Sequence, residues 1–134
     1  MMGHRVASVV VFLSLSALLA AGCGSSKPEF CSKTDDLQAA LNTLKSDVTS
    51  GNVSAIQSDA QTVTTDLDAV ASSAESDFPS ETNAVQSSVS TLTSAVRRLP
   101  SSPSANELVR LAGDVSAVTT AVNNFKSATS SACD

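Results

Sequence analysis

Few side chains in this sequence of 134 residues can do acid–base, nucleophilic or metal chemistry. The chain contains one histidine, three cysteines and thirteen aspartate or glutamate residues, and it contains neither tryptophan nor tyrosine. A catalytic pair of carboxylates has to share a cleft in which the pKa of one is shifted. The aspartates instead fall outside the apolar positions of the helical pattern described below, which favours a solvated acidic surface. The eight aspartates that lie within the predicted helices are Asp35, Asp36, Asp47, Asp59, Asp66, Asp68, Asp77 and Asp114.

The N-terminus has the composition of an export signal. His4 and Arg5 precede an apolar run of sixteen residues, 6–21, that leads into Gly22. A bilayer span needs about 20 residues, so the run is short for a transmembrane helix. The sequence therefore predicts a signal peptide over residues 1–22, and an uncleaved signal anchor is the alternative.

Residues 19–23 (LAAGC) resemble the lipobox of bacterial lipoproteins. The match departs from the commonest pattern because Ala20, and not leucine, stands three residues before the cysteine. The resemblance implies that Cys23 carries a diacylglyceryl group and becomes the first residue of the mature chain. It also implies a location at the cell membrane, lipid-anchored on the extracytoplasmic face. The composition of residues 24–30 (GSSKPEF), rich in serine, proline and glycine, predicts a short tether between this cysteine and the domain.

Cleavage before Cys23 narrows the available chemistry further. It removes His4, the only imidazole, so histidine-dependent general bases, zinc sites and nucleophile systems are excluded. The whole chain has a formal net charge of −5 and an isoelectric point near 4.6, which argues against a nucleic-acid-binding surface. We therefore expect no enzyme activity, no cofactor, no metal and no nucleic-acid partner.

From residue 31 onward the apolar residues recur at alternating spacings of three and four, which is typical of helices packed at small angles. Each break in the pattern contains glycine or proline, as expected at connections. Ser54, Ser80 and Ser104 are the predicted N-caps of the last three helices. The predicted helices span residues 33–50, 53–77, 81–99 and 104–131.

Short connections between long helices make each helix antiparallel to the next. The sequence therefore predicts an all-α domain over residues 31–134, an up-down-up-down four-helix bundle. A three-helix bundle with the first helix loosely docked is the alternative.

The two remaining cysteines flank this bundle. With Cys23 assigned to the lipid, Cys31 lies just before the first predicted helix and Cys133 just after the fourth. In an up-down-up-down bundle these points lie at the same end, and disulfides persist in exported proteins. We expect a Cys31–Cys133 disulfide, with two free thiols as the alternative.

Three phenylalanines, Phe30, Phe78 and Phe125, belong to the same end of this predicted bundle. They form either a plug beneath the disulfide, a contact with lipid, or the mouth of a pocket for a small apolar ligand.

Three arginines, Arg97, Arg98 and Arg110, flank the turn between the third and fourth predicted helices at the opposite end. Arginines in a last helical turn complement the helix dipole. The alternative role is contact with a partner or a small anion, displayed away from the membrane.

These observations together predict a membrane-anchored, non-catalytic binding module of the cell envelope. Its expected partners are the membrane, through the N-terminal lipid, and an envelope protein, and the bundle itself is expected to be a monomer. The alternative function is a carrier or sensor of a small apolar ligand held between the helices.

Overall fold

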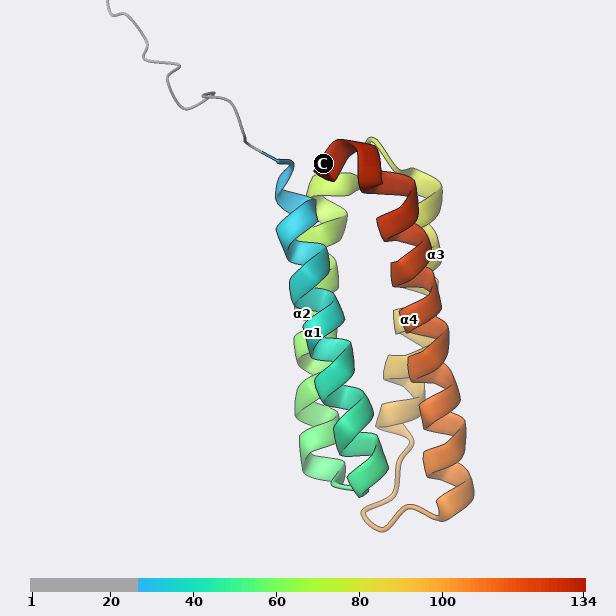
Figure 1. The fold of residues 1–134 in the computed structure, drawn as a ribbon. Coiled ribbons are helices and arrows are strands. Elements are labelled where there is room, and N and C mark those ends of the chain that lie inside the picture. The colour runs from blue at the N-terminus through green and yellow to red at the C-terminus, as the bar shows by residue number, and fades with distance from the viewer. Residues whose placement is uncertain (1–26) are drawn as a thin grey trace, which may run out of the picture.

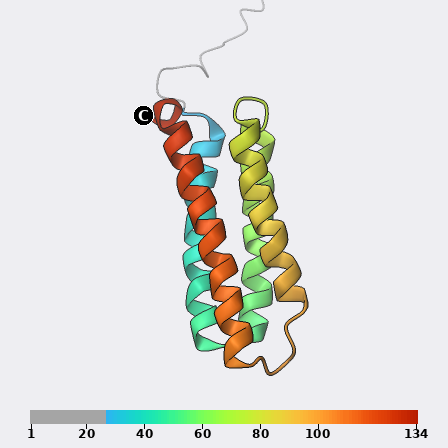
Figure 2. The same cartoon turned by 90° about the vertical axis from the view of Figure 1, so that its right-hand side faces the viewer.

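The computed structural model describes residues 27–134, which fold into four antiparallel helices without a strand (Figure 1). Helix α1 spans Glu29–Ser50, α2 spans Val53–Ala74, α3 spans Pro79–Arg97 and α4 spans Ala105–Cys133. The predicted up-down-up-down four-helix bundle is therefore confirmed. Two views at right angles show that α4 lies beside α1 while α3 lies beside α2 (Figures 1 and 2).

Helix α1 is a full member of the bundle, so the three-helix alternative is wrong. It packs against α2 and α4, and every helix contacts its two neighbours but not the helix diagonally opposite. We call the end that holds Pro28 and Asp134 the terminal end, and the end that holds the turns at 51–52 and 98–104 the distal end.

Helices α1 and α3 begin earlier than predicted, whereas α2 begins at residue 53 as predicted and α4 begins at Ala105, directly after its predicted cap Ser104. Helix α1 starts at Glu29 directly after Pro28, four residues before the predicted start, so the tether ends at residue 28. A proline at a helix start lacks only an N–H that would have no partner there, and the earlier start buries Phe30. For the same reason α3 begins at Pro79, before Ser80.

Of the two remaining predicted caps, Ser54 is wrong and Ser104 is confirmed. Asn52, and not Ser54, caps α2, because its Oδ1 accepts a hydrogen bond from the N–H of Ala55 at 3.2 Å. Ser104 caps α4 as predicted: its Oγ accepts from the N–H of Glu107 at 3.2 Å, and the Glu107 carboxylate accepts from the N–H of Ser104 at 2.7 Å. This reciprocal pair is the capping box.

The ends of the last three helices differ from the prediction by two or three residues, whereas α1 ends at Ser50 as predicted. It stops before Gly51, whose φ of 73° lies in the left-handed region that glycine adopts without strain. Helix α2 ends at Ala74 and not at 77, and α3 ends at Arg97 and not at 99. Helix α4 continues to Cys133, so this cysteine lies in the last helical turn and not after it.

One apolar core runs along the inside of all four helices and is built mostly of leucine, valine and alanine. Three threonines, Thr34, Thr82 and Thr129, are also buried in it. The hydroxyls of Thr34 and Thr129 donate to the carbonyls one turn earlier, on Phe30 and Phe125, so burial leaves neither hydroxyl without a partner. No helix in the described part of the chain is both long and apolar enough to cross a membrane.

Candidate functional site

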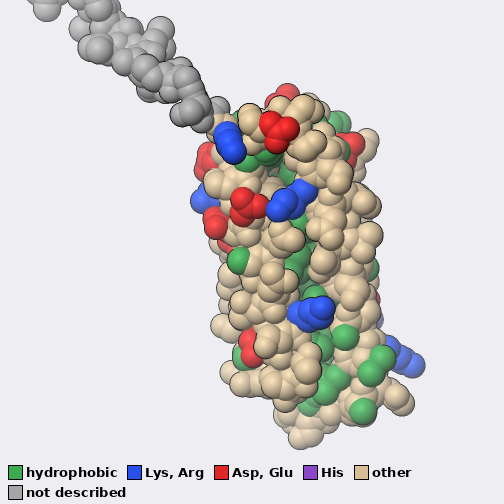
Figure 3. Space-filling model, in the orientation of Figure 1, with side chains coloured by type: hydrophobic (Ala, Val, Ile, Leu, Met, Phe, Trp, Pro, Cys, Tyr) green, Lys and Arg blue, Asp and Glu red, His purple; other side chains and the backbone are tan. Residues whose placement is uncertain are grey.

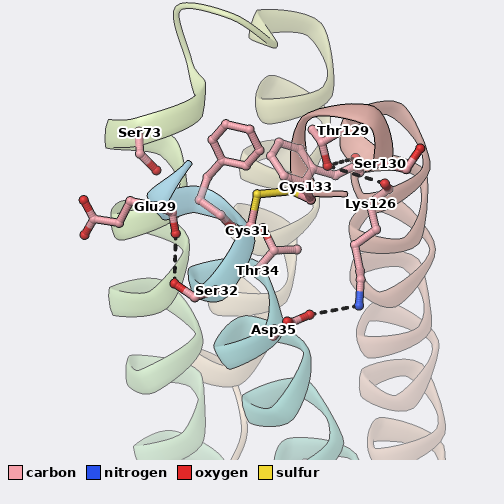
Figure 4. The surroundings of a disulfide bond; sticks show 12 residues. Glu29, Cys31, Ser32, Thr34, Asp35, Ser73, Lys126, Thr129, Ser130 and Cys133 are labelled. Atoms are coloured by element: carbon pink, nitrogen blue, oxygen red, sulfur yellow. Dashed lines mark hydrogen bonds and ion pairs between the residues drawn. A yellow bond between two sulfur atoms is a disulfide. The ribbon is translucent and has the colours of Figure 1, made fainter. Parts of the chain in front are cut away.

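The terminal end of the bundle is closed by the predicted disulfide, which the structure confirms. Cys31 in the first turn of α1 is bonded to Cys133 in the last turn of α4, and their Cα atoms are 5.7 Å apart (Figure 4). On the same side of the bundle, the Lys126 Nζ atom lies 3.0 Å from Asp35 Oδ1 and 2.7 Å from Gln38 Oε1. These contacts tie α4 to α1 a second time, one to two turns away from the bridge.

The three phenylalanines meet at this end, as predicted. Each pair of rings packs edge to face, with centroids 5.5 Å apart for Phe30–Phe78, 5.9 Å for Phe30–Phe125 and 6.3 Å for Phe78–Phe125. Phe30 and Phe125 are each only 1% exposed, while Phe78 is partly exposed. Because the three rings pack directly against one another, they form the expected plug, and no space for an apolar ligand is left between them.

The three arginines lie at the distal end but do not form one patch. Arg97 lines a groove between α2 and α3, whereas Arg98 lines a groove on the other side of α3 together with Asp114 of α4. Arg110 is exposed on α4. Consecutive helical residues point in directions about 100° apart, which explains why Arg97 and Arg98 face different neighbours.

The distal end also carries an exposed apolar residue. Val109 on α4 is 69% exposed, and among the described residues it is the one large hydrophobic side chain that is exposed in this way. Leu99 and Leu108 nearby in the fold are partly buried against the core. Hydrophobic side chains accordingly appear on the surface near this end in the space-filling view (Figure 3).

Charge is divided unequally between the two halves of the helices. The terminal half holds three basic and nine acidic residues, a net charge of −6, whereas the distal half holds four of each. Acidic side chains accordingly gather toward the terminal end on the face seen in Figure 3. The acidic surplus of the domain therefore lies at the terminal end of the bundle.

Two carboxylates that we placed on the solvated surface instead lie together. Asp47 of α1 and Asp59 of α2 are both half-buried near the Gly51 turn, and the Oδ2 atom of Asp59 is buried without a hydrogen-bond partner. Burial and the neighbouring Asp47 carboxylate raise the pKa of Asp59 to about 6. The sequence did contain a signal for this contact: Asp47 and Asp59 directly precede the apolar positions Val48 and Ala60, on either side of the same turn.

Asp59→Asn is expected to make the stability of the protein less dependent on pH. The folded pKa of about 6 lies above the ordinary value of 3.8, so the contribution of Asp59 to stability is present in acid and is lost as pH rises through the folded pKa. A full two-unit shift corresponds to roughly 3 kcal/mol, which solvent screening of this half-buried pair reduces to about 1 kcal/mol. Urea denaturation should show the variant about 1 kcal/mol more stable at neutral pH and unchanged in acid.

The exposed Asp68 on the same helix provides the control. Asp68→Asn removes the same charge from an exposed position of α2 and therefore controls for the change in net charge. Asp59→Asn leaves the smaller slope from Asp66, whose pKa is raised by burial and by the charge of Asp36, against the opposing charge of Lys33. Parallel profiles for wild type and Asp59→Asn would contradict the assignment.

No group of three or more potential metal ligands occurs within residues 27–134. Cys23, the proposed lipidation site, lies outside the described residues. Comparison of the chain with protein-family models, with curated proteins and with solved structures finds no match.

Proposed function

We propose that this protein is a bacterial lipoprotein, anchored through Cys23, whose helical bundle is a non-catalytic binding module on the extracytoplasmic side of the membrane. The observation that carries this proposal is the Cys31–Cys133 disulfide. Disulfides persist in oxidising compartments, which favours an exported protein. The bridge uses two of the three cysteines, and the third, Cys23, is the one that ends the lipobox-like segment.

The short tether sets the orientation of the bundle in this proposal. Five residue steps separate Cys23 from Pro28, so these residues can be at most roughly 18 Å apart. The terminal end is then close to the lipid, while the 29-residue helix α4 carries the distal end roughly 43 Å further out.

The short tether, and not charge, sets this orientation: the terminal half has a net charge of −6 and is repelled by anionic lipid headgroups, whereas the distal half is balanced. Held at its terminal end, the bundle presents Val109 and the arginines to an envelope protein, at the high effective concentration that anchoring provides. The plug of phenylalanines argues against the alternative role as carrier of an apolar ligand.

Cys23→Ala is expected to abolish lipid attachment and contact with the partner together. Cells grown with labelled palmitate should incorporate label into the wild type and into the Cys31→Ser/Cys133→Ser variant but not into Cys23→Ala. A photo-crosslinking residue at position 109 should form an adduct in intact cells, and the adduct should be lost with Cys23→Ala because the local concentration falls.

Ser127 provides the matched position for the crosslinker. It is exposed on the same side of α4 as Val109, five helical turns nearer the terminal end, so little adduct is expected there. Label on Cys23→Ala would contradict the anchor, and equal adducts from positions 109 and 127 would contradict contact at the distal end.

A further inference from the structure

The surface between α2 and α3 is hollowed into a groove that is lined by two glutamines, three threonines and one arginine. The groove is open to solvent, has a volume of about 630 Å³ in the distal half of the seam, and continues into a shallower groove of about 320 Å³ that shares Thr64, Thr93 and Arg97. The buried side chains of Ala60 and Val96 form its floor. A volume of this size is ordinary for a ligand site.

The hydrogen-bonding groups along the groove are available to a ligand. Gln57 and Gln61 lie one turn apart on α2, and their side-chain amides form no hydrogen bond with any residue from 27 to 134. The hydroxyls of Thr64 and Thr93 donate to the carbonyls of their own helices at 3.0 and 2.8 Å, so their oxygens remain acceptors. The walls therefore offer both donors and acceptors.

Arg97 supplies the single charge in the larger groove. Within residues 27–134 the ion pair joins Lys126 to Asp35, at the other end of the bundle. Among these residues the Arg97 guanidinium therefore has no acidic partner. A guanidinium binds a carboxylate through two parallel hydrogen bonds, which makes an acidic ligand the best fit.

The lining favours a peptide over a sugar or a nucleic acid. Sugar rings and bases pack on aromatic faces, and the phenylalanines of the bundle are in the plug at the opposite end. Gln57 and Gln61 are one helical turn apart, which puts their Cβ atoms about 6 Å from each other and is close to the repeat of about 6.6 Å between peptide groups on one side of an extended chain.

We propose that the α2–α3 groove binds an extended acidic peptide segment whose carboxylate pairs with Arg97 and whose backbone amides pair with Gln57 and Gln61. The stretch from Gln57 to Thr65 covers eight residue steps, or about 12 Å, which corresponds to about four extended residues. This site is on the side of the bundle, so it depends neither on the anchor nor on contact at Val109.

Titration of the full chain in detergent micelles, followed by NMR, tests this site directly. The probe is a library of acetylated, amidated tetrapeptides with glutamate at the second position and alanine, valine or serine elsewhere. The side-chain signals of Gln57, Gln61 and Arg97 should shift and saturate, and the matched library with glutamine in place of glutamate should bind about tenfold more weakly.

Arg98 is the matched control because it is adjacent in sequence but lines the groove on the other side of α3. Arg97→Gln should weaken binding of the glutamate library about tenfold, whereas Arg98→Gln should leave it within about twofold. Absence of saturable shifts, or equal losses in the two variants, would overturn the proposal. Binding of an acidic oligosaccharide such as trigalacturonate in preference to the peptides would overturn it as well.

Discussion

Replacing Cys31 and Cys133 together by serine is expected to lower the free energy of unfolding by about 4 kcal/mol. The two cysteines are 102 positions apart, so the bridge closes almost the whole domain into one loop and removes much of the conformational freedom of the unfolded chain. The chain-entropy treatment gives about 4.7 kcal/mol for a loop of about 100 residues, and native bridges generally contribute about 2–5 kcal/mol.

Urea denaturation followed by circular dichroism, in one detergent for all variants, measures this difference. Cys23→Ser is the control, because it removes a cysteine without opening the loop. Cys31 and Cys133 are only partly buried, at the edge of a core that the other apolar residues fill, so the double variant should still fold. A loss of stability below about 1 kcal/mol would mean that the termini are held together chiefly by packing and by the contacts of Lys126.

Phe125→Ala is expected to cost about 3–5 kcal/mol, the usual range for removal of a buried aromatic ring. The ring is 1% exposed and contacts both Phe30 and Phe78, so its loss leaves a cavity and removes two edge-to-face pairs. Thermal and urea denaturation measure the effect, and Val109→Ala at the 69% exposed position should change stability by less than about 0.5 kcal/mol.

A double-mutant cycle distinguishes the free energy of direct contact between the rings from the free energy of burying each ring. Phe30→Ala combined with Phe125→Ala should show a coupling of about 0.5–1.5 kcal/mol, the range expected for aromatic pairs in contact. Strictly additive effects would show that the two rings stabilise the bundle independently.

The spacing of apolar residues was sufficient to predict four helices and their order, because a buried stripe has to recur with the period of the helix. It could not predict where α1 starts, because the tertiary burial of Phe30 draws the chain from Glu29 onward into the helix. It also could not choose between Asn52 and Ser54 as the cap of α2, since both can accept the hydrogen bond and they are two residues apart.

Similar reasoning explains which parts of the candidate sites were predictable. The disulfide follows from topology once Cys23 is set aside, because both ends of such a bundle lie together. The separation of Arg97 from Arg98 depends on which side of α3 faces α2 and which faces α4, and apolar spacing does not specify the handedness of a bundle. The contact between Asp47 and Asp59 depends on the register of the α1–α2 hairpin, which spacing leaves equally undetermined.

The disulfide also determines how the domain responds to mechanical force. If the chain is pulled at residue 28 while the distal end is held, an unbridged bundle can peel one turn of α1 away at a time. With Cys31 bonded to Cys133, tension reaching the first turn of α1 passes at once into the last turn of α4. The pull then acts on two helices in parallel and has to shear both along α2 and α3, which requires many contacts to break together.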